Sequence, residues 1–562
     1  MINSPITIYI NWAAYDELSD NVELTEALAM RQLDELLRLR RSGARFDYYL
    51  MDAFWYARDG AYRTWRKPHW PNGPDAWLAK CLENDVKPGL WVAGNSTHSH
   101  DPIPAWRDSL TADGGSMCLF SGGFLPHFLE SQHLWVERGV RMFKFDFMNL
   151  SAATPEIERT MLPSEIRAQN IAALQAGLKV FRQQHPEVVL LGYNGLEESL
   201  WFAGAAHSTQ GNTSLPFRKT VDTKWLEVFD ALYCGDPRPA DVPTMNFWRS
   251  KDIYSDHMVR VYELNGFPLR CIDNSAFMIG TTGTCYYRRT SAWQGMLLLG
   301  LARGGWANTY YGNLDLLSDE QARWFARVQS LYLDLQAYGR FDTFGPLPGT
   351  GSAYGFAATD RDGALYAVVN PAQQTARLHL PTGLTPLRVL FHDAGYVPQL
   401  DGGAVTLGAE QLALIGAGSY ASAAYDLGVQ ADVRIPTEIA PLEASFVAEG
   451  ERAISATILP PPHGTLRIIL RQVDPRGGAR RTTGGAPPNG VTLGQLLKIT
   501  ATQNGQPVTV DVNYDKAIWS GLSWAVGEVP AERFDAGAPV TIRCESREPL
   551  AVKLEAVLYL AS

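Results

Sequence analysis

The most informative stretch of this chain is Val140-Arg-Met-Phe-Lys-Phe-Asp-Phe147. It is short and mostly apolar, which is typical of a buried strand. Side chains alternate along a strand, so Lys144 and Asp146 should point to the same side. Charged groups at the end of a buried strand are unfavourable unless they are solvated or used. The pair is therefore interpreted either as a structural ion pair or as part of a site.

Strand-like and helix-like patterns alternate on both sides of this stretch, over residues 1–341. The other predicted strands are Ile6–Asn11, Phe46–Met51, Pro88–Val92, Glu187–Tyr193, Leu226–Tyr233, Phe267–Ile272 and Trp306–Tyr310. The predicted helices are Glu23–Arg41, Asp75–Glu83, Phe124–Arg138, Pro163–Gln184, Lys251–Leu264, Thr290–Ala302 and Ser318–Tyr338. Eight apolar strands that alternate with helices predict a parallel (β/α)8 TIM barrel, the α/β architecture in which helices cover the sheet.

Polar or aromatic residues follow most of these predicted strands. They are Trp12, Asp52, Lys144 with Asp146, Asn194, Asp236 and Asp273. The carboxyl ends of barrel strands form the face on which active sites lie, so we expect these side chains to converge. Two of them have a second interpretation: Asp236 precedes Pro237 and could be a turn residue, and Asp273-Asn-Ser could be an Asx turn or helix cap.

The pattern changes after residue 341 to short strands separated by Gly and Asp turns, which indicates antiparallel β structure. We expect one β-sandwich domain over residues 342–428 and a second over 429–562. The second sandwich could be structural or could bind carbohydrate.

Composition excludes several classes of partner. The net charge of −10 argues against nucleic acid. No run of 18 apolar residues is present, so no membrane span is expected. The six Cys residues form no disulfide framework or zinc motif, and no signal peptide precedes the first strand, which together favour a cytoplasmic protein. The oligomeric state is not predicted.

Two carboxyl groups on different strand ends fit glycoside hydrolysis, in which one attacks or activates water while the other protonates the leaving oxygen. Lys144 would favour the charged form of Asp146, which suits the first role. Asp236 follows Tyr233-Cys-Gly, a partly apolar setting that suits the second.

Four segments resemble the clan D glycoside hydrolases, the α-galactosidases of families 27 and 36. Phe46–Trp55 (FDYYLMDAFW) is similar to the strand that ends in Asp-Asp-Gly-Trp. Trp65 with His69–Gly73 (HWPNG) and Val86–Val92 (VKPGLWV) resembles the family 36 run G-D-W, F-P-x-G and G-x-x-x-G-L-W-V. Lys144–Asp146 (KFD) resembles the nucleophile motif, and Gly312–Glu320 (GNLDLLSDE) resembles the closing stretch G-x-x-L-D-L…L-S-x-E-E.

The resemblance implies a retaining double displacement on an oligosaccharide or glycoside. Asp146 would be the nucleophile and Asp236 the acid/base, while Asp52 and Lys144 would bind sugar hydroxyls. The residues expected to line the pocket are Trp12, Trp55, Trp65 and Trp91. No metal or organic cofactor is implied.

The chain departs from the families where they bind galactose. Ala53 stands in place of the second Asp of the Asp-Asp pair, and Glu197 or Glu198 could supply replacement contacts. A site built to hydrogen-bond a hydroxyl discriminates strongly, so a lost ligand points to altered sugar specificity. The alternatives are a clan member for another sugar, such as α-N-acetylgalactosamine or β-L-arabinopyranose, and a non-catalytic carbohydrate-binding barrel.

Overall fold

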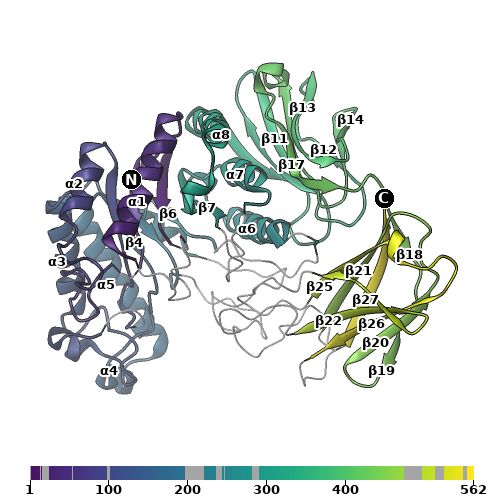
Figure 1. Cartoon of the computed structure of the whole chain (residues 1–562). Helices are drawn as coiled ribbons and strands as arrows, with labels where there is room; N and C mark the ends of the chain where they lie inside the picture. The colour runs from purple at the N-terminus through teal and green to yellow at the C-terminus, as the bar shows by residue number, and fades with distance from the viewer. Residues whose placement is uncertain are drawn as a thin grey trace.

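The computed structural model of the chain consists of a barrel followed by several β-sheets (Figure 1). It describes all residues except 1, 13, 15–23, 54, 98–100, 197–220, 236–243, 246, 281–289, 474–495, 513–523 and 548–552. In Figure 1 the barrel with its helices is coloured from purple through blue to teal, and the sheets that follow it are green and yellow.

The barrel strands form one parallel sheet in the order β6-β5-β4-β3-β2-β1-β8-β7. Their bounds are β1 (Ile6–Ile10), β2 (Tyr48–Met51), β3 (Lys87–Val92), β4 (Met142–Phe145), β5 (Val189–Gly192), β6 (Ala231–Leu232), β7 (Asp273–Ile279) and β8 (Ala307–Gly312). An isolated parallel bridge between Leu232 and Ile272 joins the two ends of the sheet. The predicted TIM-like barrel is therefore confirmed.

Helices alternate with these strands and cover the outside of the barrel (Figure 1). They are α1 (Glu26–Arg41), α2 (Asp75–Glu83), α3 (Phe124–Glu137), α4 (Pro155–Thr160), α5 (Pro163–Gln184), α6 (Phe247–Leu264), α7 (Trp293–Ala302) and α8 (Asp319–Tyr338). Local sequence features place the ends of several of these helices. Ser318 and Gln321 form a capping box at the start of α8, and Pro163 occupies the first turn of α5, where its missing N–H leaves no bond unmade.

Strand β4 shows how the barrel separates apolar and charged side chains. The ring of Phe143 packs against Phe181 of α5, and that of Phe145 against Phe128 of α3. Both phenylalanines therefore face the helices. Because neighbouring side chains alternate, Lys144 and Asp146 face the interior at the carboxyl end of the strand. Both remain more than nine-tenths buried.

The sixth and seventh strands differ from the prediction. Of the predicted strand Leu226–Tyr233, only Ala231–Leu232 is extended, after a 3-10 turn at Thr223–Glu227. The predicted strand Phe267–Ile272 is wrong, because Pro268 leads into a 3-10 turn at Leu269–Cys271 and β7 begins only at Asp273. Proline lacks the N–H that a central strand needs, so the strand starts beyond it.

Two groups of sheets follow the barrel. The first has a six-stranded sheet in the order β17-β13-β16-β11-β10-β9 and a three-stranded sheet in the order β12-β15-β14. Its strands are β9 (Arg340–Phe344), β10 (Tyr354–Thr359), β11 (Gly363–Val369), β12 (Ala376–His379), β13 (Leu387–Gly395), β14 (Gln399–Asp401), β15 (Ala404–Leu407), β16 (Leu412–Gly418) and β17 (Gly428–Ile435). Strands β10 and β11 contact α7, which places this group against the barrel.

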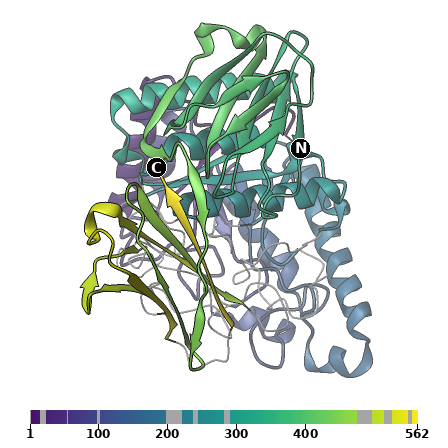
Figure 2. The same ribbon diagram turned by 90° about the vertical axis from the view of Figure 1, so that its right-hand side faces the viewer.

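The second group consists of two five-stranded antiparallel sheets, in the orders β18-β27-β21-β25-β24 and β19-β20-β26-β22-β23. The strands are β18 (Ile439–Leu442), β19 (Val447–Glu449), β20 (Ala453–Ile458), β21 (Thr465–Val473), β22 (Leu497–Gln503), β23 (Gln506–Val508), β24 (Asp511–Val512), β25 (Trp524–Pro530), β26 (Val540–Ser546) and β27 (Lys553–Ala561). We call this pair of sheets the C-terminal sandwich (Figure 2). Strand β17 crosses the predicted border between residues 428 and 429 and pairs with β13 of the first group. The domain borders stay predictions.

In the described part of the chain, none of the helices combines the length and the apolar character that crossing a bilayer requires.

Asn170 of α5 fastens two loops at the carboxyl end of the barrel, so its loss should destabilise the fold. Its side chain accepts the N–H of Leu119 at 2.8 Å and donates to the carbonyls of Leu150 and Ala152 at 3.1 and 2.8 Å. Asn170→Ala leaves these three buried backbone groups unpaired and should lower the free energy of unfolding by about 3 kcal/mol. Urea unfolding measures this change.

Asn84→Ala is the matched control for this prediction. Asn84 is exposed, and its side chain donates to the carbonyl of Lys80 at 2.8 Å. Its loss should change the free energy of unfolding by at most about 0.5 kcal/mol. Similar losses for both variants would contradict the proposed role of Asn170.

Candidate active site

The carboxylate of Asp146 is held by donors from three neighbouring strand ends. Its Oδ2 accepts the indole N–H of Trp91, from β3, at 3.1 Å. Its Oδ1 accepts the side-chain amide of Asn194, beyond β5, at 2.8 Å, and the backbone N–H of Phe147 and Asn194 at 2.9 and 3.2 Å. Four donors therefore fix the orientation of this carboxylate at the mouth of the barrel.

Two backbone features bring these donors close. Phe147 has φ +50°, an uncommon conformation for a bulky residue, and this turns its N–H back onto Asp146. Gly195 has φ +99°, and a Cβ at this position would overlap the carbonyl oxygen of Met148. The ends of β4 and β5 can therefore approach closely, which places Asn194 against Asp146.

Lys144 and Asp52 form a buried ion pair beside Asp146. The distance from Lys144 Nζ to Asp52 Oδ2 is 2.8 Å, and the side chains are 5% and 4% exposed. Burial raises the pKa of Asp52, the Lys144 ammonium opposes this shift, and the negative charge of Asp146 adds to it. The Lys144 ammonium was predicted to keep Asp146 ionised, but its ion pair in the structure is with Asp52.

The second oxygen of Asp52 and its backbone connect it to the chain around it. Oδ1 accepts the N–H of Ala53 at 2.8 Å, and the N–H of Asp52 donates to Asn11 Oδ1 at 2.7 Å. Asn11 lies beyond β1 and is buried. Sequence reasoning missed Asn11 as a site residue, although its place directly after the first strand was the available signal.

The ring of Tyr193 contacts the Lys144 ammonium. The ammonium lies 4.2 Å from the centre of the Tyr193 ring, a cation–π contact, and this ring stacks on Tyr233 at 4.5 Å. The Tyr193 hydroxyl donates to Asp273 and lies 3.2 Å from the hydroxyl of Tyr311. Sequence reasoning treated Tyr193 as the end of a strand and missed this role.

Asp273 does not lie where it was predicted. It begins β7 instead of following a strand, so it is not at the carboxyl-terminal face. It reaches the site indirectly, because it accepts hydrogen bonds from Tyr193 and from Thr309 of β8. Burial raises the pKa of Asp273 to about 6, while the two hydroxyl donors and the Lys144 charge oppose the shift. A chain of contacts therefore runs from Asp273 through Tyr193 and Lys144 to Asp52.

The predicted tryptophans have different surroundings. Trp91 contacts Asp146, and Trp12 is half-buried directly after β1. Trp55 and Trp65 are buried, with exposed fractions of 0% and 5%, and their role in lining the pocket stays a prediction. Their rings lie 4.8 Å apart, and both pack against the ring of Trp135 in α3.

Asp236 and Glu197 lie outside the described residues. The described chain reaches Gly235 beyond β6 and Leu196 beyond β5. The acid/base role of Asp236 and the substrate contact of Glu197 stay predictions. Among the residues that the structure describes, no three His, Cys, Asp or Glu side chains gather as metal ligands.

Asp273→Asn should change how stability depends on pH. A native pKa of about 6, against an ordinary value of about 3.9, means that the native state keeps a proton which the unfolded chain has lost between these values. Wild-type stability should therefore fall as the pH rises through this window. Asparagine cannot titrate, so the stability of the variant relative to wild type should rise by about 2 kcal/mol between pH 4 and pH 7.

Guanidinium unfolding at pH 4, 5, 6 and 7 measures this difference. Asp401→Asn is a suitable control, because Asp401 is exposed and pairs at 3.0 Å with Arg377, which is also exposed. A difference between Asp273→Asn and wild type that stays constant with pH would contradict the assignment.

Comparisons with known proteins find no matching family model and no matching curated protein. Solved structures do match. The α-galactosidase from Lactobacillus brevis has a TM-score of 0.51 and 12% identity over 74% of this chain and 55% of that chain. The galactosidase domain of alpha-galactosidase-sucrose kinase, AgaSK, has a TM-score of 0.49 and 14% identity over 74% and 55%, respectively. A putative α-galactosidase from Bacteroides fragilis has a TM-score of 0.47 and 10% identity over 75% and 80%.

The chain thus spans about half the length of the first two of these proteins. The Lactobacillus brevis match confirms the fold, and with it the predicted resemblance to α-galactosidases at the level of the fold. At 12% identity it carries no further information on activity.

Proposed function

We propose that this protein is a retaining glycoside hydrolase that removes a terminal α-galactosyl or closely related residue. The observation that carries the proposal is the carboxylate of Asp146, which donors from Trp91, Phe147 and Asn194 hold at the mouth of the barrel. A nucleophile needs a fixed orientation toward the carbon that it attacks. The buried Lys144–Asp52 pair beside it offers a donor and an acceptor for sugar hydroxyls.

The reaction would proceed in two displacements. In the first, an Asp146 oxygen attacks the anomeric carbon as the glycosidic C–O bond breaks, and Asp236 gives its proton to the leaving oxygen. In the second, Asp236 takes a proton from water, and the water oxygen attacks the same carbon and releases Asp146. Two inversions at one carbon return the original configuration. The part of Asp236 rests on the resemblance of the sequence.

The identity of the sugar depends on the side of the site that contains Ala53. Ala53 is buried next to Asp52 and has no polar side chain, so one sugar hydroxyl would lack the partner that the Asp-Asp pair supplies in α-galactosidases. An α-galactoside is the first candidate substrate. The substitution points to a sugar other than galactose as the second candidate, such as an α-N-acetylgalactosaminide or a β-L-arabinopyranoside.

Asp146→Ala should abolish turnover. The purified enzyme and the variant are assayed on nitrophenyl α- and β-glycosides, and proton NMR identifies the first anomer that wild type releases. Loss of the nucleophile should lower kcat at least about 1000-fold, and the wild-type product should keep the configuration of the substrate. Asp401→Ala, at an exposed position, should keep full activity.

An active Asp146→Ala variant would refute the nucleophile, and an inverted product would refute double displacement. A wild-type protein that binds sugar but turns over none of the panel would favour the non-catalytic carbohydrate-binding barrel.

Asp236→Ala should affect substrates unequally. A nitrophenolate leaves with little help, whereas a sugar alcohol must be protonated as it leaves. We therefore expect a loss of about 100-fold or more on a disaccharide and a much smaller loss on the nitrophenyl glycoside, measured as the first-step rate. Equal losses on both substrates would contradict the acid/base role.

A further inference from the structure

Three parts of the molecule meet at Glu410, which lies in the loop between β15 and β16 and is 3% exposed. The first part is the barrel segment that leads into α6. The second is the first group of sheets, to which Glu410 belongs. The third is the C-terminal sandwich, which contributes Arg467 from β21.

The carboxylate of Glu410 binds the chain just before α6. Its two oxygens lie 3.1 and 3.2 Å from the backbone nitrogen of Met245, which donates to them. The side-chain amide of Gln373 also donates to this carboxylate. Arg467 Nη1 lies 3.8 Å from Glu410 Oε1 and donates to Gln373 Oε1 at 2.6 Å. The sandwich is therefore linked through Glu410 to the barrel.

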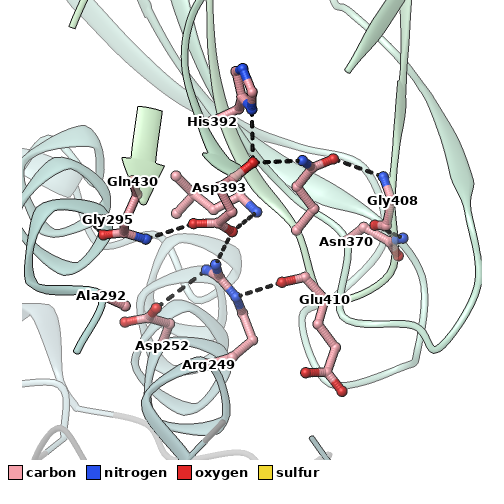
Figure 3. Close-up of polar contacts among 12 residues, drawn as sticks. Arg249, Asp252, Ala292, Gly295, Asn370, His392, Asp393, Gly408, Glu410 and Gln430 are labelled. Carbon is pink, nitrogen blue, oxygen red and sulfur yellow. Dashed lines mark hydrogen bonds and ion pairs between the residues drawn. The ribbon is translucent and has the colours of Figure 1, made fainter. Parts of the chain in front are cut away.

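The first turn of α6 is bound to the same loop. Arg249 is fully buried, and its Nε donates to the carbonyl of Glu410 at 3.1 Å (Figure 3). Its guanidinium pairs with Asp393 of β13 at 2.9 Å and with Asp252 at 3.4 Å. Asp393 in turn accepts the side-chain amide of Gln430, whose oxygen accepts the N–H of Gly295 in α7. A buried charge held by several partners is costly to displace, so these contacts oppose movement of this turn.

Glu410 adopts a backbone conformation that glutamate rarely takes. Its φ is +51°, in the left-handed region that favours glycine. Its N–H donates to the carbonyl of Ala372 at 3.0 Å, and its side chain is enclosed by the three partners already named. A strained residue persists when its surroundings over-determine it, and such residues gather where position matters. Glycine would suit this backbone conformation but has no carboxylate, so the contacts made by the carboxylate distinguish glutamate at this position.

We propose that Glu410 is a positioning residue, through which the C-terminal sandwich and the first group of sheets hold the end of the β6–α6 connection at Met245 and Arg249. This inference rests on the proposed function, because the same connection carries Asp236. The sandwich is then part of the catalytic unit and not an independent binding module.

Glu410→Gly tests the inference, because glycine suits φ +51° and keeps the carbonyl that Arg249 uses while it removes the carboxylate. We expect kcat on a disaccharide to fall about 10-fold, with a much smaller change on the nitrophenyl glycoside and an unchanged KM. Amide hydrogen exchange in a peptide over residues 244–250 should become faster. Glu410→Gln, which keeps one acceptor, should restore part of both losses.

Arg467→Met is a second variant from the sandwich side and should show the same pattern with a smaller size. Arg543→Met is the matched control: Arg543 is an ion-paired arginine in β26 of the same sandwich, 2.9 Å from Glu449, and is partly exposed. It should leave the activity and the exchange over residues 244–250 at the wild-type level.

Unchanged exchange over residues 244–250 in both Glu410→Gly and Arg467→Met would overturn the proposal, whatever the activities are. Equal losses on the two substrates would also overturn it, because a misplaced acid must slow the poor leaving group more. Failure of the proposed function gives a different result. The activity loss of Asp236→Ala would then be independent of the leaving group, while the exchange measurement would still decide whether Glu410 holds Met245.

Discussion

The buried ion pair between Lys144 and Asp52 is the interaction on which the mouth of the barrel depends. Both side chains are almost fully enclosed, and removing either partner would leave an uncompensated charge inside the protein. The pair also joins β4 to the end of β2, and its ammonium lies on the ring of Tyr193 beyond β5. Three strand ends thus share one charged contact.

A polar chain extends from this pair into the barrel. The ring of Tyr193 contacts Lys144, and its hydroxyl donates to Asp273. Thr309 of β8 also donates to that carboxyl. Most TIM barrels fill this space with branched apolar residues. Here a carboxyl with a pKa raised to about 6 lies under the site, so the charge balance of the barrel interior changes in a pH range where ordinary carboxyls no longer titrate.

Buried polar contacts join the sheets that follow the barrel to the barrel itself. Arg249, Asp393 and Gln430 tie α6 and α7 to the first group of sheets, and Glu410 adds the C-terminal sandwich through Arg467. These contacts are buried and charged, so they are strong only in one geometry. They meet at the start of the helix that follows β6, which is why the sheets bear on the face of the barrel where chemistry is proposed.

Much of the fold could be predicted from the sequence because its signals are local. The alternation in Val140–Phe147 indicates a strand whose two charged side chains share a face, and the capping residue Ser318 places the start of the helix that ends at Tyr338, which agrees with the structure. Eight apolar strands alternating with helices over about 340 residues predict a barrel, because such strands need helices on the outer face of a parallel sheet.

Which side chains meet in the site depends on the three-dimensional fold. The pairing of Lys144 with Asp52, the place of Asp273 at the start of β7 and the roles of Asn11 and Tyr193 depend on the register between strands that are far apart in sequence. Trp55 and Trp65 became core residues because α3 supplies an aromatic partner that no local pattern reveals. A sequence determines which face a side chain takes along its own strand or helix, whereas its neighbours across the barrel follow from closure and packing, which involve the whole chain at once.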